Sequence, residues 1–172
     1  MLYYVRKANE QDLADILTII ENGRETLNKA GIPQWRNNDG PNKERLLNDL
    51  KLEEGYVLIE ESKIIGYGTI TKEEQTGYGK ITNGSWLPSD KYVSLHRIAI
   101  HSDIKERGKG QFFLGCLISL SVNLGYKDIR IDTHPVNTRM QKVIEKAGFK
   151  YQGDIILPSV SDGERKAYQV II

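Results

Sequence analysis

The chain has 172 residues, a formal net charge of +1 and a hydrophobic share of 39%. These values indicate one soluble globular domain, and so small a charge provides no global field for nucleic acid or an anionic membrane. One cysteine and three separated histidines argue against a disulfide framework and a metal site, and neither a signal peptide nor an apolar run of about 20 residues is visible, so we expect a cytoplasmic protein without membrane or metal.

The first half of the sequence predicts two helices and a meander of strands. A strand is expected over 2–6, a helix after Asn9, which can cap it, and a second helix after the loop 34–41. Strands over 56–60 and 63–71 join through a turn at 61–62. Residues 72–90 form a long connection with room for a short strand at 78–82, and a loop of this length is often functional.

The second half predicts a crossover followed by a hairpin. A strand over 91–100 leads through a polar loop to a helix over 111–126, then to a strand over 127–134 and a helix over 135–149. Strands over 149–156 and 165–171 follow, joined through a turn at 161–164. We expect an α/β fold in a single domain, 1–172, with one twisted mixed sheet of about seven strands and helices on both faces.

The stretch RIAIHSDIKERGKGQFF, 97–113, is the most informative for chemistry. Arg107, Gly108, Lys109 and Gly110 place backbone N–H groups at the start of the expected helix, where the helix dipole favours a phosphate. A Walker A pattern is absent, and Phe113 stands where a dinucleotide fingerprint needs its third glycine. The alternative is a charged loop whose glycines serve tight turning.

Three pieces of the sequence together resemble the GCN5-related N-acetyltransferase (GNAT) superfamily. Its pyrophosphate loop reads Gln/Arg-x-x-Gly-x-Gly/Ala, and Arg107, Gly110 and Phe112 occupy those places. RIAI at 97–100 is similar to the family's preceding strand, and 137–149 is similar to its later helix, with Gly148 and Phe149 at the end. The resemblance covers about 93–152, which we expect to be the acetyl-CoA-binding core.

The resemblance implies acetyl-coenzyme A as donor and an amine as acceptor. Two strands of the family splay apart, and the pantetheine arm lies between them. The residues expected at the cofactor are Ile98, Ala99, Ile100, Arg107, Gly108, Lys109, Gly110, Gln111, Phe112, His134 and Asn137. For His134 the alternative is a loop histidine that caps the next helix.

Two positions depart from the family pattern. Phe112 replaces the last small residue of the loop, so its ring either crowds the phosphate or turns into the core and offers only its N–H. Ile144 stands where many members carry a general-acid tyrosine. A thiolate of pKa about 8.5 leaves without an obligatory proton donor, so this loss weakens a role and does not abolish the reaction.

His96 is the first candidate for removing the acceptor's proton, because the pKa of histidine suits a base near neutrality. Strand alternation predicts Tyr92, Ser94, His96, Ile98 and Ile100 on one face and Val93, Leu95, Arg97 and Ala99 on the other. Ser94 could hold a water beside His96. Alternatively, both are ordinary strand residues.

Trp35 and Trp86 lie in loops, where each could form a substrate wall or anchor its loop. The resulting hypothesis is an N-acetyltransferase acting by direct transfer on a primary amine of a small molecule, with a homodimer possible. Two alternatives stay open: a non-catalytic coenzyme A-binding sensor, and a protein N-acetyltransferase, which would need an open groove for a peptide.

Overall fold

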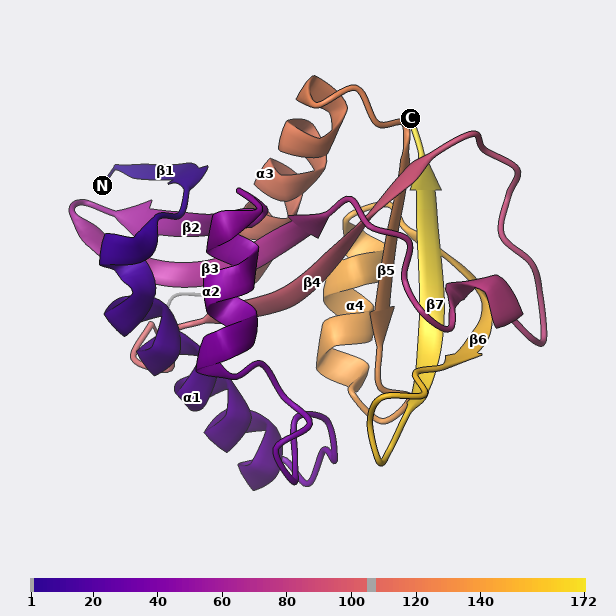
Figure 1. Cartoon of the computed structure of the whole chain (residues 1–172), viewed down its shortest axis with the longest axis horizontal. Coiled ribbons are helices and arrows are strands. Elements are labelled where there is room, and N and C mark those ends of the chain that lie inside the picture. Colours follow the sequence, from indigo (N-terminus) through magenta and orange to yellow (C-terminus); the bar gives the residue numbers. More distant parts are fainter. Residues whose placement is uncertain (1, 105–107) are drawn as a thin grey trace.

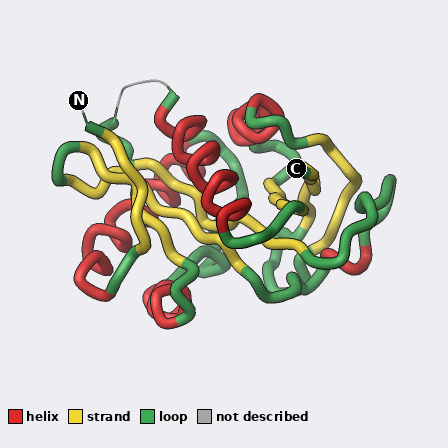
Figure 2. Tube along the Cα trace, turned by 90° about the horizontal axis from the view of Figure 1, so that it is seen from above, coloured by secondary structure: helices red, strands yellow, loops and turns green. Residues whose placement is uncertain are grey.

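The computed structural model describes residues 2–104 and 108–172 of the chain. These residues form one seven-stranded sheet in the order β1-β2-β3-β4-β5-β7-β6, with helices on both sides (Figures 1 and 2). The elements in chain order are β1 Tyr3–Lys7, η1 Glu10–Asp12, α1 Leu13–Lys29, α2 Lys43–Lys51, β2 Gly55–Glu60, β3 Lys63–Thr71, η2 Tyr78–Lys80, β4 Tyr92–Ile100, α3 Lys109–Asn123, β5 Asp128–Thr133, α4 Thr138–Lys146, β6 Lys150–Ile156 and β7 Glu164–Ile171. The predicted fold class and element order are confirmed.

The sheet is mixed because only β4 and β5 pair in parallel, joined by the α3 crossover. Every other neighbouring pair is antiparallel. Parallel neighbours need a long connection, whereas the tight turn between β2 and β3 forces antiparallel pairing. This parallel β4/β5 pair lies at the centre of the sheet, between the antiparallel strands β1 to β3 and the antiparallel strands β7 and β6.

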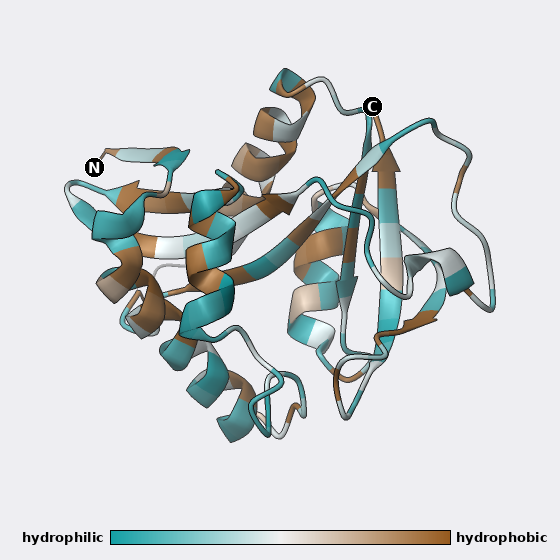
Figure 3. Cartoon of the chain, in the orientation of Figure 1, coloured by the Kyte–Doolittle hydropathy of each residue, from teal (hydrophilic) through white to brown (hydrophobic). Residues whose placement is uncertain are grey.

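Two apolar layers cover the two faces of the sheet. On one face, α3 and α4 bury Val93, Leu95, Phe113 and Ile144 in the main core. On the other face, α1 and α2 pack on a second cluster that includes Val57 and Ala99. Figure 3 shows apolar residues in the central strands and along α3 and α4. The two faces are referred to below as the α3/α4 face and the α1/α2 face.

The long connection between β3 and β4 covers a third, smaller cluster around Tyr78, Ile155 and Ala167. The possible strand at 78–82 is wrong for its first half, because Tyr78–Lys80 is a 3₁₀ turn. Only an isolated bridge from Thr82 to Asp154 pairs the connection with β6. This segment is thereby held over β5, β6 and β7 on the α1/α2 side.

A bulge in β4 overturns the predicted alternation of that strand. Tyr67 of β3 pairs with Ala99 and Thr69 pairs with His96. One residue of β3 between these pairs therefore lies opposite two residues of β4. Arg97 is the extra residue and has a left-handed φ of 56°. After the bulge, Ile98 and Ile100 join the core of the α3/α4 face, and Ala99 joins the α1/α2 face. Arg97 reaches α2 and pairs with Asp49, so its predicted place beside Val93 and Leu95 is also wrong.

Candidate active site

The strands β4 and β5 separate at the centre of the sheet. Their parallel ladder runs from Tyr92 and Asp128 to Leu95 and Ile131 and stops there. Beyond this point β4 continues along β3 to Ile100, and β5 continues along β7 to Thr133. Figure 1 shows the two strands diverging. The stretch past Leu95 and Ile131 is called the β4/β5 opening below, and β5 offers no ladder partner to the backbone of Ile98, Ala99 and Ile100 there.

The helix α3 begins near this opening, on the α3/α4 face, as the glycine-rich motif predicts. Gly108 precedes it with a left-handed φ of 93°, which glycine adopts without strain. Among the residues that the structure describes, the first bond within the helix runs from the Phe112 N–H to the Gly108 carbonyl, at 2.8 Å. The amides of Gly110 and Gln111 therefore precede the helix's own ladder. A Cβ added at Gly110 would point into open space. Arg107 lies outside the described residues.

The side chains of the first turn of α3 point away from this amide-rich end. The Lys109 Nζ lies 3.3 Å from the centre of the Tyr3 ring, and the Phe112 ring meets Tyr3 edge-on, with centres 6.3 Å apart. The Gln111 amide lies 3.2 Å from both the Val143 oxygen and the Ala147 nitrogen of α4, oriented to bond both. Both predictions for Phe112 are therefore wrong: it neither crowds the phosphate site nor turns into the core. The residue is 45% exposed, its ring lies against β1, and its N–H bonds within the helix.

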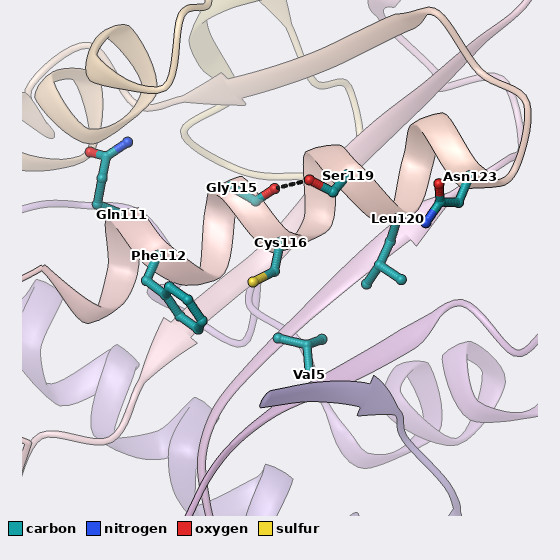
Figure 4. A pocket seen from close by; sticks show the side chains of 8 residues that line it. All are labelled: Val5, Gln111, Phe112, Gly115, Cys116, Ser119, Leu120 and Asn123. Carbon is teal, nitrogen blue, oxygen red and sulfur yellow. Dashed lines mark hydrogen bonds between the residues drawn. The ribbon is translucent and has the colours of Figure 1, made fainter. Parts of the chain in front are cut away.

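Figure 4 shows the shallow groove that Phe112 lines together with Val5 of β1 and Cys116 of α3. Its volume is about 460 Å³, and most of its lining is apolar. Cys116 is partly exposed there, and burial raises the pKa of its thiol, so the thiolate is disfavoured at neutral pH. This groove lies between β1 and α3, away from the β4/β5 opening.

His134 and Asn137 hold the turn between β5 and α4. The Nδ1 atom of His134 accepts the Val136 N–H at 3.2 Å, which leaves Nε2 to donate to Asp162 at 3.1 Å. Asn137 caps α4 by accepting the Met140 N–H and donates to Gln34 at 3.2 Å. Both residues therefore have structural partners at the end of β5, beside the opening.

Three polar side chains of the opening, Ser94, His96 and Asp132, lie on the α1/α2 face. His96 and Asp132 are the next residues after the last ladder pair, and their Nδ1 and Oδ2 atoms are 3.8 Å apart. Ser94 precedes them on the same face. Among the described residues, the buried atoms Ser94 Oγ, His96 Nε2 and Thr133 Oγ1 have no hydrogen-bond partner. Such orphaned atoms indicate a place for water or ligand.

Burial and neighbouring charges determine the protonation of His96 and Asp132. Burial lowers the pKa of His96 to about 3, and the charges of Arg97 and Arg45 act in the same direction. Its ring is therefore neutral at pH 7. Burial raises the pKa of Asp132, although hydrogen bonding from Tyr78 and the charge of Arg165 oppose this. Of the two, the carboxylate holds a proton better.

The two tryptophans lie on different sides of the opening. Trp35 packs on α1, where a Cβ added at Gly23 would lie 3.0 Å from its ring, and its carbonyl accepts from Arg24 at 2.8 Å. Trp86 donates its Nε1–H to the Tyr78 carbonyl at 2.7 Å and stacks on the Tyr78 ring. Both contacts anchor their loops, and the predicted contact of either ring with a substrate stays a prediction.

The sequence reading did not identify Asp132 or Tyr78. Tyr78 donates to Asp132 at 2.7 Å from the connection between β3 and β4. The alternation of Asp128, Arg130 and Asp132 with Ile129 and Ile131 was a usable signal, since it places polar groups on one face of a buried strand. No comparable pattern marks Tyr78, because the connection has no periodicity.

These features together fit coenzyme A. The start of α3 presents amides and the positive end of a dipole to a phosphate, with no acidic residue in its first turn. The backbone of Ile98 to Ile100 can bond an amide-containing arm, and Thr133 carries an unpartnered hydroxyl on the same α3/α4 face. Within the described ranges, no helix is long and apolar enough to cross a membrane, and no metal-ligand group forms.

Comparisons with known proteins agree with this geometry. The model of the acetyltransferase (GNAT) family matches residues 24–149. A GNAT-family acetyltransferase from Streptococcus agalactiae is 33% identical, with 99% of this chain and 95% of that chain covered and a TM-score of 0.88. A Listeria monocytogenes GNAT-family acetyltransferase is 19% identical, with 99% and 95% covered and a TM-score of 0.72.

The same fold occurs in yncA of Salmonella typhimurium, which was solved with its cofactor acetyl-CoA. It is 17% identical, with 98% of this chain and 93% of that chain covered and a TM-score of 0.67. A search of curated proteins gave no significant match. The family match over most of the chain and the 33% identity decide the assignment: the chain belongs to the GNAT family of acetyltransferases.

Proposed function

We propose that the protein is an N-acetyltransferase that moves the acetyl group of acetyl-CoA directly to a primary amine of a small molecule. The observation that carries this proposal is the β4/β5 opening, which has a different chemistry on each face. The α3 terminus lies on the α3/α4 face, and the β4 backbone past Leu95 faces the opening itself. His96 and Asp132 serve the α1/α2 face.

The two faces support a direct transfer. The pyrophosphate would lie at the amides of Gly110 and Gln111, with the pantetheine arm along Ile98 to Ile100. The thioester would then reach the opening, and the amine would approach it from the α1/α2 face. Transfer needs positioning and an N–H donor for the developing oxyanion, and the side of β4 that has no β5 partner past Leu95 can supply such a donor.

A general acid for the leaving thiolate is not required. Ile144, at the position where many relatives carry a tyrosine, is fully buried in the main core. Tyr168 is buried in the same core, and burial raises the pKa of its hydroxyl to about 12. A thiolate with a pKa of about 8.5 is stable enough to leave and take a proton from water.

Two loop contacts beside the opening support a small acceptor over a peptide. The 30–42 loop reaches the 157–163 loop through Asp39, which accepts from the backbone N–H of Ser161 at 2.9 Å and from its hydroxyl. The same loop reaches α4 through Gln34 and Asn137. These bridges lie where an extended peptide would need an open groove.

The test is a panel of amines with acetyl-CoA, followed by thiol release and mass detection of the acetylated product. Gly110→Asp should abolish acetyl-CoA binding, because it places a negative charge in the phosphate site, and circular dichroism should show an unchanged fold. Gly115→Asp is the matched control, since its added Cβ also meets open space on the same helix. Tight acetyl-CoA binding without turnover on any amine would favour the sensor module, and equal affinity of the two variants would refute the loop assignment.

A further inference from the structure

Asp132 is the carboxylate that stands at the β4/β5 opening. It follows directly after Ile131, the last residue of β5 that pairs with β4. Its partner across the opening is His96, with 3.8 Å between Oδ2 and Nδ1. The Asp132 side chain is 5% exposed and the His96 side chain 17%. Both groups thus border the opening with little contact to bulk water.

The Asp132 carboxylate is held by groups from two other elements. The Tyr78 hydroxyl donates to Oδ2 at 2.7 Å, and the Tyr78 ring is fixed between Trp86 and Tyr92, with ring centres 5.2 and 5.9 Å away. Arg165 of β7 places its Nε 3.7 Å from Oδ1, too far for a direct hydrogen bond. Each carboxylate oxygen therefore keeps room for a further donor.

His96 is suited to receive a hydrogen bond and poorly suited to remove a proton. Burial lowers the pKa of its ring to about 3, so it is neutral and only weakly basic. With its Nδ1 proton toward Asp132, the Nε2 lone pair is a buried acceptor, and among the described residues no donor reaches it. Nε2 lies across the ring from Nδ1, so its lone pair points away from Asp132, and the carboxylate is the group that can take a proton at the opening.

We propose that Asp132 is a catalytic residue: it binds the acceptor as a primary ammonium ion and takes its proton. Tyr78 is the positioning residue for the carboxylate. This inference rests on the proposed N-acetyltransferase function and names the base and the substrate class of that site. A primary ammonium brings a positive charge and N–H donors on one narrow nitrogen to a buried carboxylate whose oxygens have room for a further donor.

The proton and electron balance of the step is complete. An N–H bond of the ammonium breaks and its proton moves to an Asp132 oxygen. The freed lone pair forms a C–N bond to the thioester carbonyl carbon, and the C–S bond then breaks, so that coenzyme A leaves as a thiolate. The nitrogen loses a second proton, which neutralises the thiolate, and Asp132 returns its proton to water. An alcohol fits this step less well, because it brings no positive charge to the buried carboxylate and its hydroxyl is far less acidic than an ammonium of pKa about 10.

The test compares Asp132→Asn with the wild type on an amine found by the panel. The amide oxygen still accepts from Tyr78, so the fold should hold, and acetyl-CoA affinity by calorimetry should change less than about two-fold. We expect kcat/KM to fall by at least about 100-fold, the usual contribution of a general base. His96→Gln should cost less, because it leaves the base in place.

Tyr78→Phe tests the positioning role through the pH profile of kcat/KM. Loss of the donated hydrogen bond should shift the acidic limb to higher pH, because that bond stabilises the charged carboxylate. A structural role alone would lower the rate and leave the limb in place. Turnover of a primary amine that is much faster than that of its hydroxyl analogue is the expected substrate pattern.

The outcomes separate this inference from the function on which it rests. Wild-type turnover that persists in Asp132→Asn, or equal turnover of the alcohol analogue, overturns the role of Asp132 and leaves the acetyltransferase intact. Binding of acetyl-CoA without turnover on any amine overturns both. Loss of acetyl-CoA affinity in Asp132→Asn would also contradict the proposal, since it would place the carboxylate at the cofactor.

Discussion

Replacing Arg97 with glycine tests how the bulge in β4 is held. Arg97 adopts a φ of 56°, a conformation that costs a non-glycine residue about 1–2 kcal/mol. Its guanidinium pairs with Asp49, with Nε 2.8 Å from Oδ2 and Nη2 2.9 Å from Oδ1. Glycine relieves the backbone strain but leaves a carboxylate that is 1% exposed without its partner.

The loss of the ion pair outweighs the relief of strain. Removing one partner of a buried pair costs about 3–5 kcal/mol. Tyr67 still donates to Asp49 at 3.1 Å and Arg45 remains 3.6 Å away, which favours the lower end of that range. After subtracting the strain, we expect Arg97→Gly to lose about 2 kcal/mol. For a domain of this size, that lowers Tm by about 4–8 °C.

The deficit should depend on pH with a definite sign. Burial raises the pKa of Asp49, and Arg97 opposes that rise, so its removal raises the pKa further. When the pKa of a carboxyl is higher in the folded state than in the unfolded state, its contribution to stability is complete at pH values below the unfolded-state pKa. That contribution is lost as the pH rises through the folded-state pKa. The variant should therefore be close to wild type near pH 4 and weakest near neutral pH.

Urea unfolding followed by circular dichroism at acidic and neutral pH measures both effects. Arg45→Gln is the control, because this half-exposed partner should contribute less than about 1 kcal/mol. Adding Asp49→Asn to Arg97→Gly should restore part of the stability, since the amide needs no counter-charge. An Arg97→Gly variant as stable as wild type at neutral pH, or a deficit independent of pH, would refute the reasoning.

Two further predictions concern the connection between β3 and β4. Gly84→Ala should lower the free energy of unfolding by about 1–3 kcal/mol, because its Cβ would overlap the Gln152 carbonyl oxygen of β6. Gly79→Ala is the control and should be near neutral, because its Cβ meets open space. Equal Tm values of the two variants would contradict the close approach of Gly84 to β6. Trp86→Phe keeps an aromatic ring on Tyr78 but loses the 2.7 Å bond to its carbonyl, so urea unfolding should show a loss of about 1 kcal/mol, and an unchanged midpoint would mean that water replaces the indole.

The order of elements was predictable because local periodicity decides it. The apolar spacing around Ile16 and Ile20 predicts α1, and the pattern around Phe113 and Leu117 predicts α3. The parallel β4/β5 pair follows from a strand-helix-strand order and the handedness of crossovers. The bulge was not predictable, since Arg97 is held by Asp49, a residue 48 positions away. Assuming perfect alternation therefore misplaced every residue of β4 after His96.

In the candidate site, too, the features set by local sequence were predictable and those set by tertiary contacts were not. The glycines at 108 and 110 mark the start of α3 because glycine has a local reason to stand there. The pKa of His96 is lowered by burial and by the charge of Arg97, which depend on the tertiary structure. The sequence therefore predicts His96 as the base only if its pKa has the ordinary value of a histidine. Asp132 gains its environment from Tyr78 and Arg165, which come from distant parts of the chain.

The bulge also explains why one strand can serve both reactants. In a regular strand the side chains of His96, Ile98 and Ile100 would share one face, whereas the backbone N–H and C=O groups point along the sheet toward the neighbouring strands. The extra residue at Arg97 reverses the alternation, so Ile98 and Ile100 face α3 while His96 stays on the α1/α2 face. The same residue coincides with the end of the β4/β5 ladder. One insertion thus lies beside the point where the ladder ends and sets which side chains of β4 face each helix layer.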